Sequence, residues 1–283
     1  MKKIILFFTA ASFFFSFSSA FSSDFYSNPY WNTGKAEYQL YEARIKKYGI
    51  MRTAEVKIIM VKEPFDMEKI VKTRREKNAD DVIKMNYIQV IPTGVYNYYQ
   101  TASIFFHRKT GTVMKYTMSS QDGCGNTFME YLLKDTRHEF KFYSYFDDEG
   151  DKEISIERGN FFFYDSLPIS LRPMLNGTGL HKIMLARSFI SNRTEPVKIE
   201  EAEVIIKQIR TISIKGKAYT PVYKAVVKCL DKTDTLYFET VFPYRLLKWD
   251  KNSGDSLTLK GSKFFYYWEY TKPENADFLM QQQ

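Results

Sequence analysis

Apolar and polar residues alternate along most of the chain with a period of two, which is typical of β-strands. The run FKFYSYF places Phe140, Phe142 and Phe146 on one face of a strand, with Tyr143 and Tyr145 on the other. Aromatic residues on both faces indicate a sheet that is covered on both sides. No window downstream of residue 20 shows a sustained helical period, so the pattern predicts an all-β protein.

The alternation predicts a hairpin of residues 36–48 and 51–62 around Gly49, in which Pro64 ends the second strand. A meander follows, with turns at residues 92–94 and 109–111. The remaining strands are expected at residues 82–91, 96–108, 112–119, 140–146, 154–157, 161–164, 182–189, 197–214, 219–230, 235–241, 244–249 and 256–270. Residues 167–175 are the expected short helix, with Pro168 near its start and Gly177 after its end.

Composition favours one large β domain over two smaller domains. Aromatic residues make up 17% of the chain, and Gly and Pro together number 22 of 283 residues, so long strands are joined by short turns. The prediction is a signal peptide over residues 1–20 and a single β domain over residues 21–283, with possible sub-halves at 30–150 and 151–272. The expected architecture is a long curved antiparallel sheet, an open or half-closed barrel with one or two short helices.

The N-terminus has the form of a secretory signal peptide. Lys2 and Lys3 precede an apolar core, and Ser18-Ser19-Ala20 offers a cleavage site before Phe21. The apolar core is shorter than the roughly 20 residues of a spanning helix, so the mature chain is not expected to span a membrane. These features predict an exported protein, periplasmic or extracellular.

Charge gives little support to a nucleic-acid partner. Without residues 1–20 the chain has 41 − 2 = 39 basic and 33 acidic residues, a net charge of +6 that is scattered along the sequence. The dense basic run at residues 69–77 is followed at once by Asp80 and Asp81, which is typical of a solvated loop or short exposed helix. Export also argues against nucleic acid, and binding to an anionic surface remains an open alternative.

Two cysteines invite two interpretations. Gly123-Cys124-Gly125 predicts a bulge or a close approach of another backbone, with Cys124 held at a bend, where it could act as a nucleophile with His107 or His138 as base. No catalytic motif surrounds it. In an exported protein a disulfide between Cys124 and Cys229 is the favoured expectation, with two unpaired thiols as the alternative.

No metal, cofactor or catalytic residue is predicted. The three histidines, at positions 107, 138 and 181, lack zinc-ligand spacing. An acidic turn around Gly150 could attract calcium, but it lacks the EF-hand spacing, so a solvated turn is favoured; its carboxylates are Asp147, Asp148, Glu149, Asp151 and Glu153. Nothing in the sequence selects a pair of carboxylates for glycoside hydrolysis.

Aromatic runs are the remaining candidate for a binding site. Sheet core is the favoured interpretation, because buried aromatic residues dominate cores of this composition. The functional interpretation is an apolar concave face that holds an acyl chain or a glycan. The residues predicted to form it are Tyr96, Tyr98, Phe105, Phe162, Tyr266 and Trp268.

Short motifs over most of the chain resemble known secreted proteins. Residues 30–37 (YWNTGKAE), Tyr48-Gly49, Ser119-Ser120-Gln121 with Cys124-Gly125, and residues 142–146 resemble an uncharacterised family of secreted bacterial proteins. Some of its members carry the label "septum formation inhibitor Maf". The chain lacks the Ser-x-Ser-Pro-Arg-Arg loop of the Maf nucleotide pyrophosphatases, so their activity is not expected.

The C-terminal half is similar to secreted proteins of unknown function whose curved antiparallel sheets resemble periplasmic lipoprotein carriers. Residues 167–175 (LPISLRPML), Phe242-Pro243-Tyr244 and Tyr267-Trp268 carry this similarity. It implies a curved sheet and brings no catalytic residue.

The leading hypothesis is a non-catalytic exported protein that binds a lipid or another amphiphile of the cell envelope. The first alternative is a structural or protein-interaction factor of the envelope without a small ligand. The third hypothesis is a hydrolase whose site the sequence does not identify.

Overall fold

Sixteen strands form one curved sheet in the computed structural model, which describes residues 20–74 and 79–272. The chain order is β1 (Ala36–Lys47), β2 (Ile50–Asp66), β3 (Val71–Lys72), β4 (Ala79–Pro92), β5 (Asn97–His107), β6 (Val113–Gln121), β7 (Asn126–Leu133), β8 (Arg137–Ser144), β9 (Lys152–Glu157), β10 (Phe162–Phe163), β11 (Gly179–Ala186), β12 (Ile199–Ile209), β15 (Val222–Cys229), β16 (Lys232–Glu239), β17 (Leu246–Asp250) and β18 (Ser256–Phe265). β13 (Ile212–Ile214) and β14 (Lys217–Tyr219) form a separate small hairpin.

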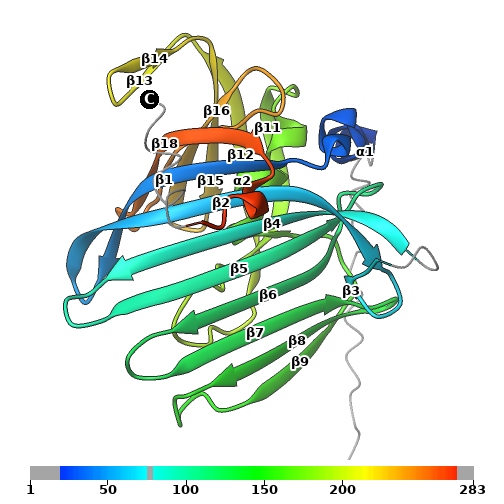
Figure 1. Ribbon diagram of the computed structural model, residues 1–283, viewed down its shortest axis with the longest axis vertical. Helices are drawn as coiled ribbons and strands as arrows, with labels where there is room; N and C mark the ends of the chain where they lie inside the picture. The colour runs from blue at the N-terminus through cyan, green and yellow to red at the C-terminus, as the bar shows by residue number, and fades with distance from the viewer. Residues whose placement is uncertain (1–19, 75–78, 273–283) are drawn as a thin grey trace, which may run out of the picture.

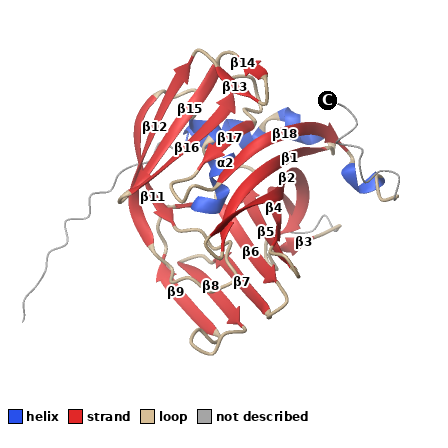
Figure 2. Cartoon of the chain, turned by 90° about the vertical axis from the view of Figure 1, so that its left-hand side faces the viewer, coloured by secondary structure: helices blue, strands red, loops and turns tan. Residues whose placement is uncertain are grey.

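The sheet is an open half-barrel. Its strand order is β10-β11-β12-β15-β16-β17-β18-β1-β2-β4-β5-β6-β7-β8-β9, with β3 attached to β2. The pairing of β1 with β18 joins the two ends of the chain into one sheet, while the end strands β9 and β10 are not neighbours in it. Figures 1 and 2 show two limbs, β4–β9 and β11, β12, β15 and β16, that face each other across a concave side. The predicted all-β fold with a long curved sheet is confirmed.

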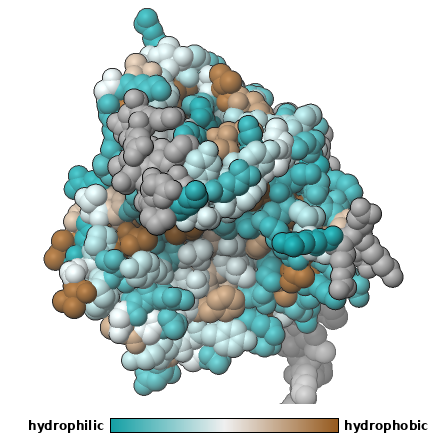
Figure 3. Space-filling model, in the orientation of Figure 1, coloured by the Kyte–Doolittle hydropathy of each residue, from teal (hydrophilic) through white to brown (hydrophobic). Residues whose placement is uncertain are grey.

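The main core lies on the concave side. Alternate residues of each strand point to that side, and most of these residues are apolar. In β8, Phe140 and Phe142 are buried whereas Tyr143 is 46% exposed. The expectation of a sheet covered on both sides is therefore wrong at β8, although Val82 of β4 is buried on the outer side in a small cluster with Phe65. The outer face of this limb is mainly hydrophilic, with separate apolar patches, as Figure 3 shows.

A short helical segment fills part of the concave side. It consists of η2 (Tyr164–Ser166), α2 (Leu167–Ser170) and η3 (Arg172–Met174), so the helix expected over residues 167–175 is present but broken into short turns. Leu167, Ile169 and Leu171 are fully buried in the main core cluster. Within the described ranges, no helix is long and apolar enough to cross a membrane.

The helix α1 (Ala20–Ser27) was not predicted, and it docks on the same core. Phe25 and Tyr26 are buried, and the Phe25 carbonyl accepts a 2.9 Å hydrogen bond from Trp31 Nε1. The predicted signal peptide lies outside the described residues except for Ala20, and the basic run at residues 69–77 is described only as far as residue 74.

Pro64 does not end its strand, contrary to the prediction. β2 runs on to Asp66, with Pro64 paired opposite Asp81 of β4. β1 pairs with β2 only as far as Met60, so the missing N–H of Pro64 faces no β1 partner. On that side the Pro64 carbonyl accepts only from Thr73 N, at 3.1 Å, beside the two-residue strand β3, and a proline is tolerated where the regular ladder has ended in this way.

Candidate functional site

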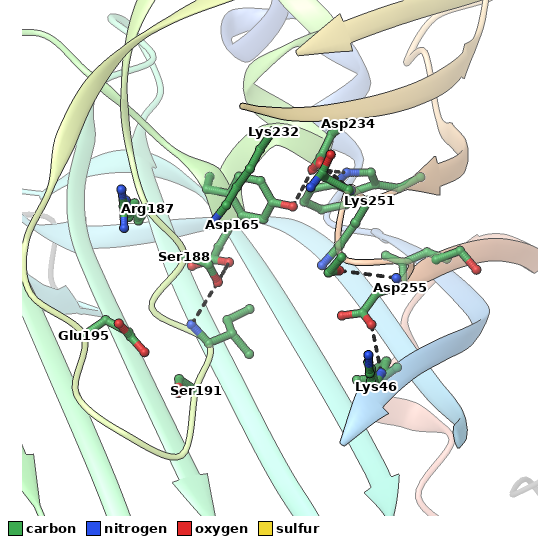
Figure 4. A pocket seen from close by; sticks show the side chains of 18 of the residues that line it. Lys46, Asp165, Arg187, Ser188, Ser191, Glu195, Lys232, Asp234, Lys251 and Asp255 are labelled. Carbon is green, nitrogen blue, oxygen red and sulfur yellow. Dashed lines mark hydrogen bonds between the residues drawn. The ribbon is translucent and has the colours of Figure 1, made fainter. Parts of the chain in front are cut away.

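A cavity of about 560 Å³ lies on the concave side between the two limbs of the sheet. The ends of β1 and β4 form one wall, and β11, β15 and β16 form the opposite wall. Its aliphatic lining is Ile45, Ile91, Leu185, Ile190, Val227, Leu230 and Leu257. Figure 4 shows charged side chains gathered around the same space.

A row of buried polar side chains crosses the concave face from the cavity outward. Gln89, Gln100, Ser120 and Thr127 are directly paired across β4, β5, β6 and β7, at inward positions that are otherwise apolar. The Gln89 amide donates to Gln100 Oε1, and Gln100 Nε2 donates to Ser120 Oγ at 3.0 Å. Buried polar groups need partners, and each member of this row has one; Gln89 and Gln100 line the cavity, whereas Ser120 and Thr127 continue the row beyond it toward Asn192.

Asp165 forms part of the cavity floor, at the start of the helical segment. Its carboxylate accepts hydrogen bonds from Tyr116 Oη at 2.7 Å, Ser188 Oγ at 2.6 Å and Phe189 N at 2.7 Å. Burial raises the pKa of the Asp165 carboxyl, although these hydrogen bonds act in the opposite direction. The protein therefore holds this acid firmly from three sides.

Asp234 of β16 is held in the same way. It accepts hydrogen bonds from the Tyr164 hydroxyl, from Trp249 Nε1 at 3.1 Å and from Asn252 N at 2.9 Å. These contacts fix the rings of Tyr164 and Trp249, whose centroids are 5.2 Å apart, at the edge of the cavity.

Lys251 extends over these two rings from the turn between β17 and β18. Its Nζ lies 4.3 Å from the Trp249 centroid and 5.6 Å from the Tyr164 centroid. Burial lowers the Lys251 pKa, against the attraction of Asp165, Asp255 and Asp234, which raises it. The cavity thus combines an ammonium, two aromatic rings and an apolar wall.

The loop between β11 and β12, residues 187–198, crosses the open side of the cavity, and we refer to it as the strap. Asn192 O accepts from Thr127 Oγ1 at 2.7 Å, and Asn192 Oδ1 accepts from Lys47 Nζ at 2.5 Å. Beyond them, Glu149 accepts from Thr194 N at 2.7 Å and pairs with Arg193 Nη1 at 3.0 Å. The acidic turn around Gly150 is therefore the anchor of the strap.

None of the six predicted binding residues lines this cavity. Tyr96 and Tyr98 lie together, with ring centroids 5.9 Å apart, and Tyr98 contacts Lys47 near the cavity rim. Tyr266 and Trp268 also pair, at 5.6 Å, near the C-terminal end of the described chain. Phe105 packs on Phe65 on the outer side of β5, and Phe162 is half-buried in β10. Their role in ligand binding stays a prediction.

The expected disulfide is absent from the structure, in which both cysteines are free thiols. Cys124 is exposed in the β6–β7 turn, and Cys229 is half-buried at the end of β15 on the cavity wall. In the sheet order β16, β17, β18, β1, β2, β4 and β5 stand between β15 and β6, so the two thiols belong to different limbs.

The predicted bend at Gly123-Cys124-Gly125 is present as the turn between β6 and β7, but the close approach there comes from the Tyr145 side chain and not from another backbone. A Cβ on Gly125 would lie 2.8 Å from Cβ of Tyr145 and closer still to its ring, so only glycine fits there. The thiol of Cys124 lies 3.6 Å from Tyr96 Oη. His138 instead contacts Tyr131 Oη at 2.9 Å, and His107 lies 3.4 Å from Asp80. The structure therefore does not bring Cys124 together with either proposed base.

Sequence reasoning missed Lys251, Asp165 and Asp234. Lys251 lies in the turn Asp250-Lys251-Asn252-Ser253-Gly254, where a charged residue is ordinary. The signal that could have pointed to the cavity is the polar row, because Gln89 and Gln100 occupy inward positions in strands that otherwise alternate regularly. Comparison of the chain with protein-family models, with curated proteins and with solved structures found no match.

Proposed function

We propose that this chain is an exported, non-catalytic protein that binds a lipid or another amphiphile of the cell envelope, in the periplasm or outside the cell. The observation that carries the proposal is the cavity, about 560 Å³ in volume, inside the concave side of the sheet. Sites for small molecules have volumes of roughly 300 to 1,000 Å³ and combine apolar walls with a few placed polar groups.

The distribution of polarity within the cavity supports an amphiphile. Leu185 and Val227 supply an apolar wall, while Lys251, Asp165 and Asp234 gather at its charged part. An apolar chain would pack on the wall and a polar head would meet the charged groups. Beyond the buried Phe189, the strap is held over the space by hydrogen bonds at residues 192–194, which are easier to open than a packed core.

The test is ligand binding with a blocked-cavity variant. We expect native mass spectrometry of gently purified protein to show one bound amphiphile per chain, and a fluorescent fatty acid to bind with the same stoichiometry. Ser191→Trp, on the strap beside the cavity, should abolish probe binding. The matched control is Ser213→Trp on the exposed hairpin strand β13, which should bind the probe normally. A folded wild-type protein that binds no amphiphile of any kind would overturn the proposal.

A second candidate function, an envelope protein-interaction factor, rests on an exposed aromatic pair. Phe128 and Tyr143 are directly paired on the outer face of β7 and β8, with ring centroids 6.1 Å apart, and are 38% and 46% exposed. Aromatic residues are enriched at protein interfaces. Crosslinking in intact cells should then give a defined partner with the wild type and lose it with Phe128→Ser/Tyr143→Ser; an unchanged crosslinking pattern would exclude this face.

A further inference from the structure

Lys251 is fixed at the cavity by its own turn. Its backbone N–H donates to the Asp255 carbonyl at 2.9 Å, and its carbonyl accepts from Gly254 N at 2.9 Å. The side chain then lies across the rings of Trp249 and Tyr164, which are themselves held by Asp234. The ammonium thus occupies a defined position rather than moving freely at the surface.

Within residues 20–74 and 79–272, the ammonium of Lys251 has ring contacts but no hydrogen-bond acceptor. An ammonium carries three N–H donors, and a ring face attracts its charge without replacing three hydrogen bonds. Among the residues that the structure describes, no carboxylate lies within 4.0 Å of Lys251 Nζ, and no oxygen accepts a hydrogen bond from it. Its donors are directed at a space that a ligand can fill.

The neighbouring carboxylates differ from Lys251 in this respect. Asp165 and Asp234 each accept three hydrogen bonds from the protein, and Asp255 accepts one from Lys46 N at 2.8 Å. Their charge attracts Lys251 from a distance, but burial outweighs that attraction and lowers the Lys251 pKa. Beside the rings of Trp249 and Tyr164, a cationic head group would compete for oxygens of Asp165 and Asp234 that are already in use, whereas an anionic head group would supply the acceptor that Lys251 lacks.

We propose that the ligand of this cavity is an anionic amphiphile whose carboxylate or phosphate oxygen accepts hydrogen bonds from Lys251 Nζ, beside the rings of Trp249 and Tyr164. The apolar chain of the ligand then lies along Leu185, Ile190 and Val227 on the cavity wall. This inference rests on the proposed function and adds the chemical class of the head group.

The first arm of the test compares ligands on the wild-type protein by displacement of a neutral fluorescent lipid probe. Palmitate and a single-chain phosphate monoester of equal chain length should displace the probe at concentrations at least tenfold lower than hexadecanol, palmitate methyl ester or hexadecylamine. A preference for palmitate over the phosphate, or the reverse, identifies the source of the anion. Tightest binding by hexadecylamine would overturn the inference.

The second arm changes the lysine. Lys251→Met keeps most of the length of the side chain and removes its charge, so the affinity for the anionic ligands should fall by about tenfold or more, while that for hexadecanol stays unchanged. The matched control is Lys232→Met, which removes an exposed lysine at the cavity rim and should change neither affinity by more than about threefold. Lys251→Arg should retain part of the preference for anions.

The two proposals fail differently. If neither the fluorescent lipid probe nor any other amphiphile binds and none co-purifies, the proposed function is wrong. If anionic and neutral amphiphiles bind alike and Lys251→Met changes neither, the cavity binds amphiphiles but the anion inference is wrong. The wild-type ligand series decides the question even if Lys251→Met fails to fold.

Discussion

The concave side of this sheet has a filled part under the helical segment and a hollow part at the cavity, and the two differ in whether their buried charged groups have partners. Under the helical segment, Leu167, Ile169 and Leu171 leave no exposed surface, and Arg172 donates to Glu37 Oε1 at 2.8 Å within a buried network. In the cavity, by contrast, the ammonium of Lys251 lacks an acceptor in the described chain and faces empty volume. The filled part stabilises the fold. The hollow part combines a charged group with an open volume, which is typical of binding sites.

The largest expected effect is on the filled part, at its buried ion pair. Arg172 is fully buried, and besides Glu37 it donates to the carbonyls of Pro168 at 2.8 Å and Pro243 at 3.2 Å. Arg172→Ala leaves Glu37 as an unpaired buried charge, which costs about 3 to 5 kcal/mol in the free energy of unfolding. Urea unfolding measures it. The double variant Arg172→Met/Glu37→Gln should lose clearly less, and a loss below about 1 kcal/mol for Arg172→Ala would contradict the contrast.

A matched pair of leucines compares the two parts directly. Leu171 is buried among the helical segment and the sheet, whereas Leu185 is buried on the cavity wall. Leu→Ala substitutions in cores cost about 2 to 5 kcal/mol, and the cost grows with the volume that the surrounding side chains leave empty. We expect Leu171→Ala near the upper end and Leu185→Ala near the lower end, in urea unfolding of the ligand-free protein. Equal losses of stability would mean that the cavity wall is packed as tightly as the core.

Much of the fold could be predicted from alternation alone, because each long strand buries one face. The predicted strand over residues 36–48 is β1, and that over 82–91 is the central part of β4. The predictions were wrong where contacts between distant strands, and not the local pattern, determine the structure. Pro64 is tolerated because β2 has lost its β1 neighbour there, and the outward Tyr143 is exposed because no layer covers that face.

The site could not be predicted because its parts come together only in the curved sheet. Asp165, Asp234 and Lys251 are scattered through the C-terminal half of the sequence, and each sits in a local pattern that has an ordinary structural meaning. The predicted aromatic residues were chosen for their apolar character, yet the cavity is distinguished by polar groups. Gln89 and Gln100 are polar at inward positions where the strand pattern predicts apolar residues. This departure from the pattern is the signal in the sequence that indicates the cavity.

A smaller effect on stability is expected at the anchor of the strap. A change there should affect closure of the cavity more than the stability of the core. Burial alone would raise the pKa of Glu149, but hydrogen bonds from Ser144, Thr194 and Arg193 outweigh it and hold the pKa below its usual value. A group with a lowered folded pKa stabilises the protein above its unfolded pKa, near 4.3, and that contribution is lost as pH falls through the folded pKa. The anchor is therefore intact at neutral pH and weakens below about pH 4.

Glu149→Gln tests the anchor. At pH 7 it should lower the free energy of unfolding by on the order of 1 kcal/mol and speed the release of a bound fluorescent lipid. The difference from the wild type should shrink as the pH falls below about 4, because the wild-type carboxylate is then protonated. Glu153→Gln is the control, because Glu153 is an exposed carboxylate of the same acidic region whose partner is Lys141, not the strap. Release rates that do not differ between the two variants would show that the strap does not gate the cavity.

The smallest expected effect is that of reduction, because the structure holds Cys124 and Cys229 as free thiols. Titration of the denatured, unreduced protein should detect two thiols per chain, and a reducing agent should leave the melting temperature unchanged. If no thiol is detected, the two cysteines form the disulfide after all.

In the native protein, the reaction rates of the two thiols should differ, because their surroundings differ. Cys124 is exposed and should react fast, whereas burial raises the pKa of the Cys229 thiol on the cavity wall and should slow its reaction. A bound amphiphile should slow Cys229 further and leave Cys124 unaffected, since only Cys229 borders the cavity.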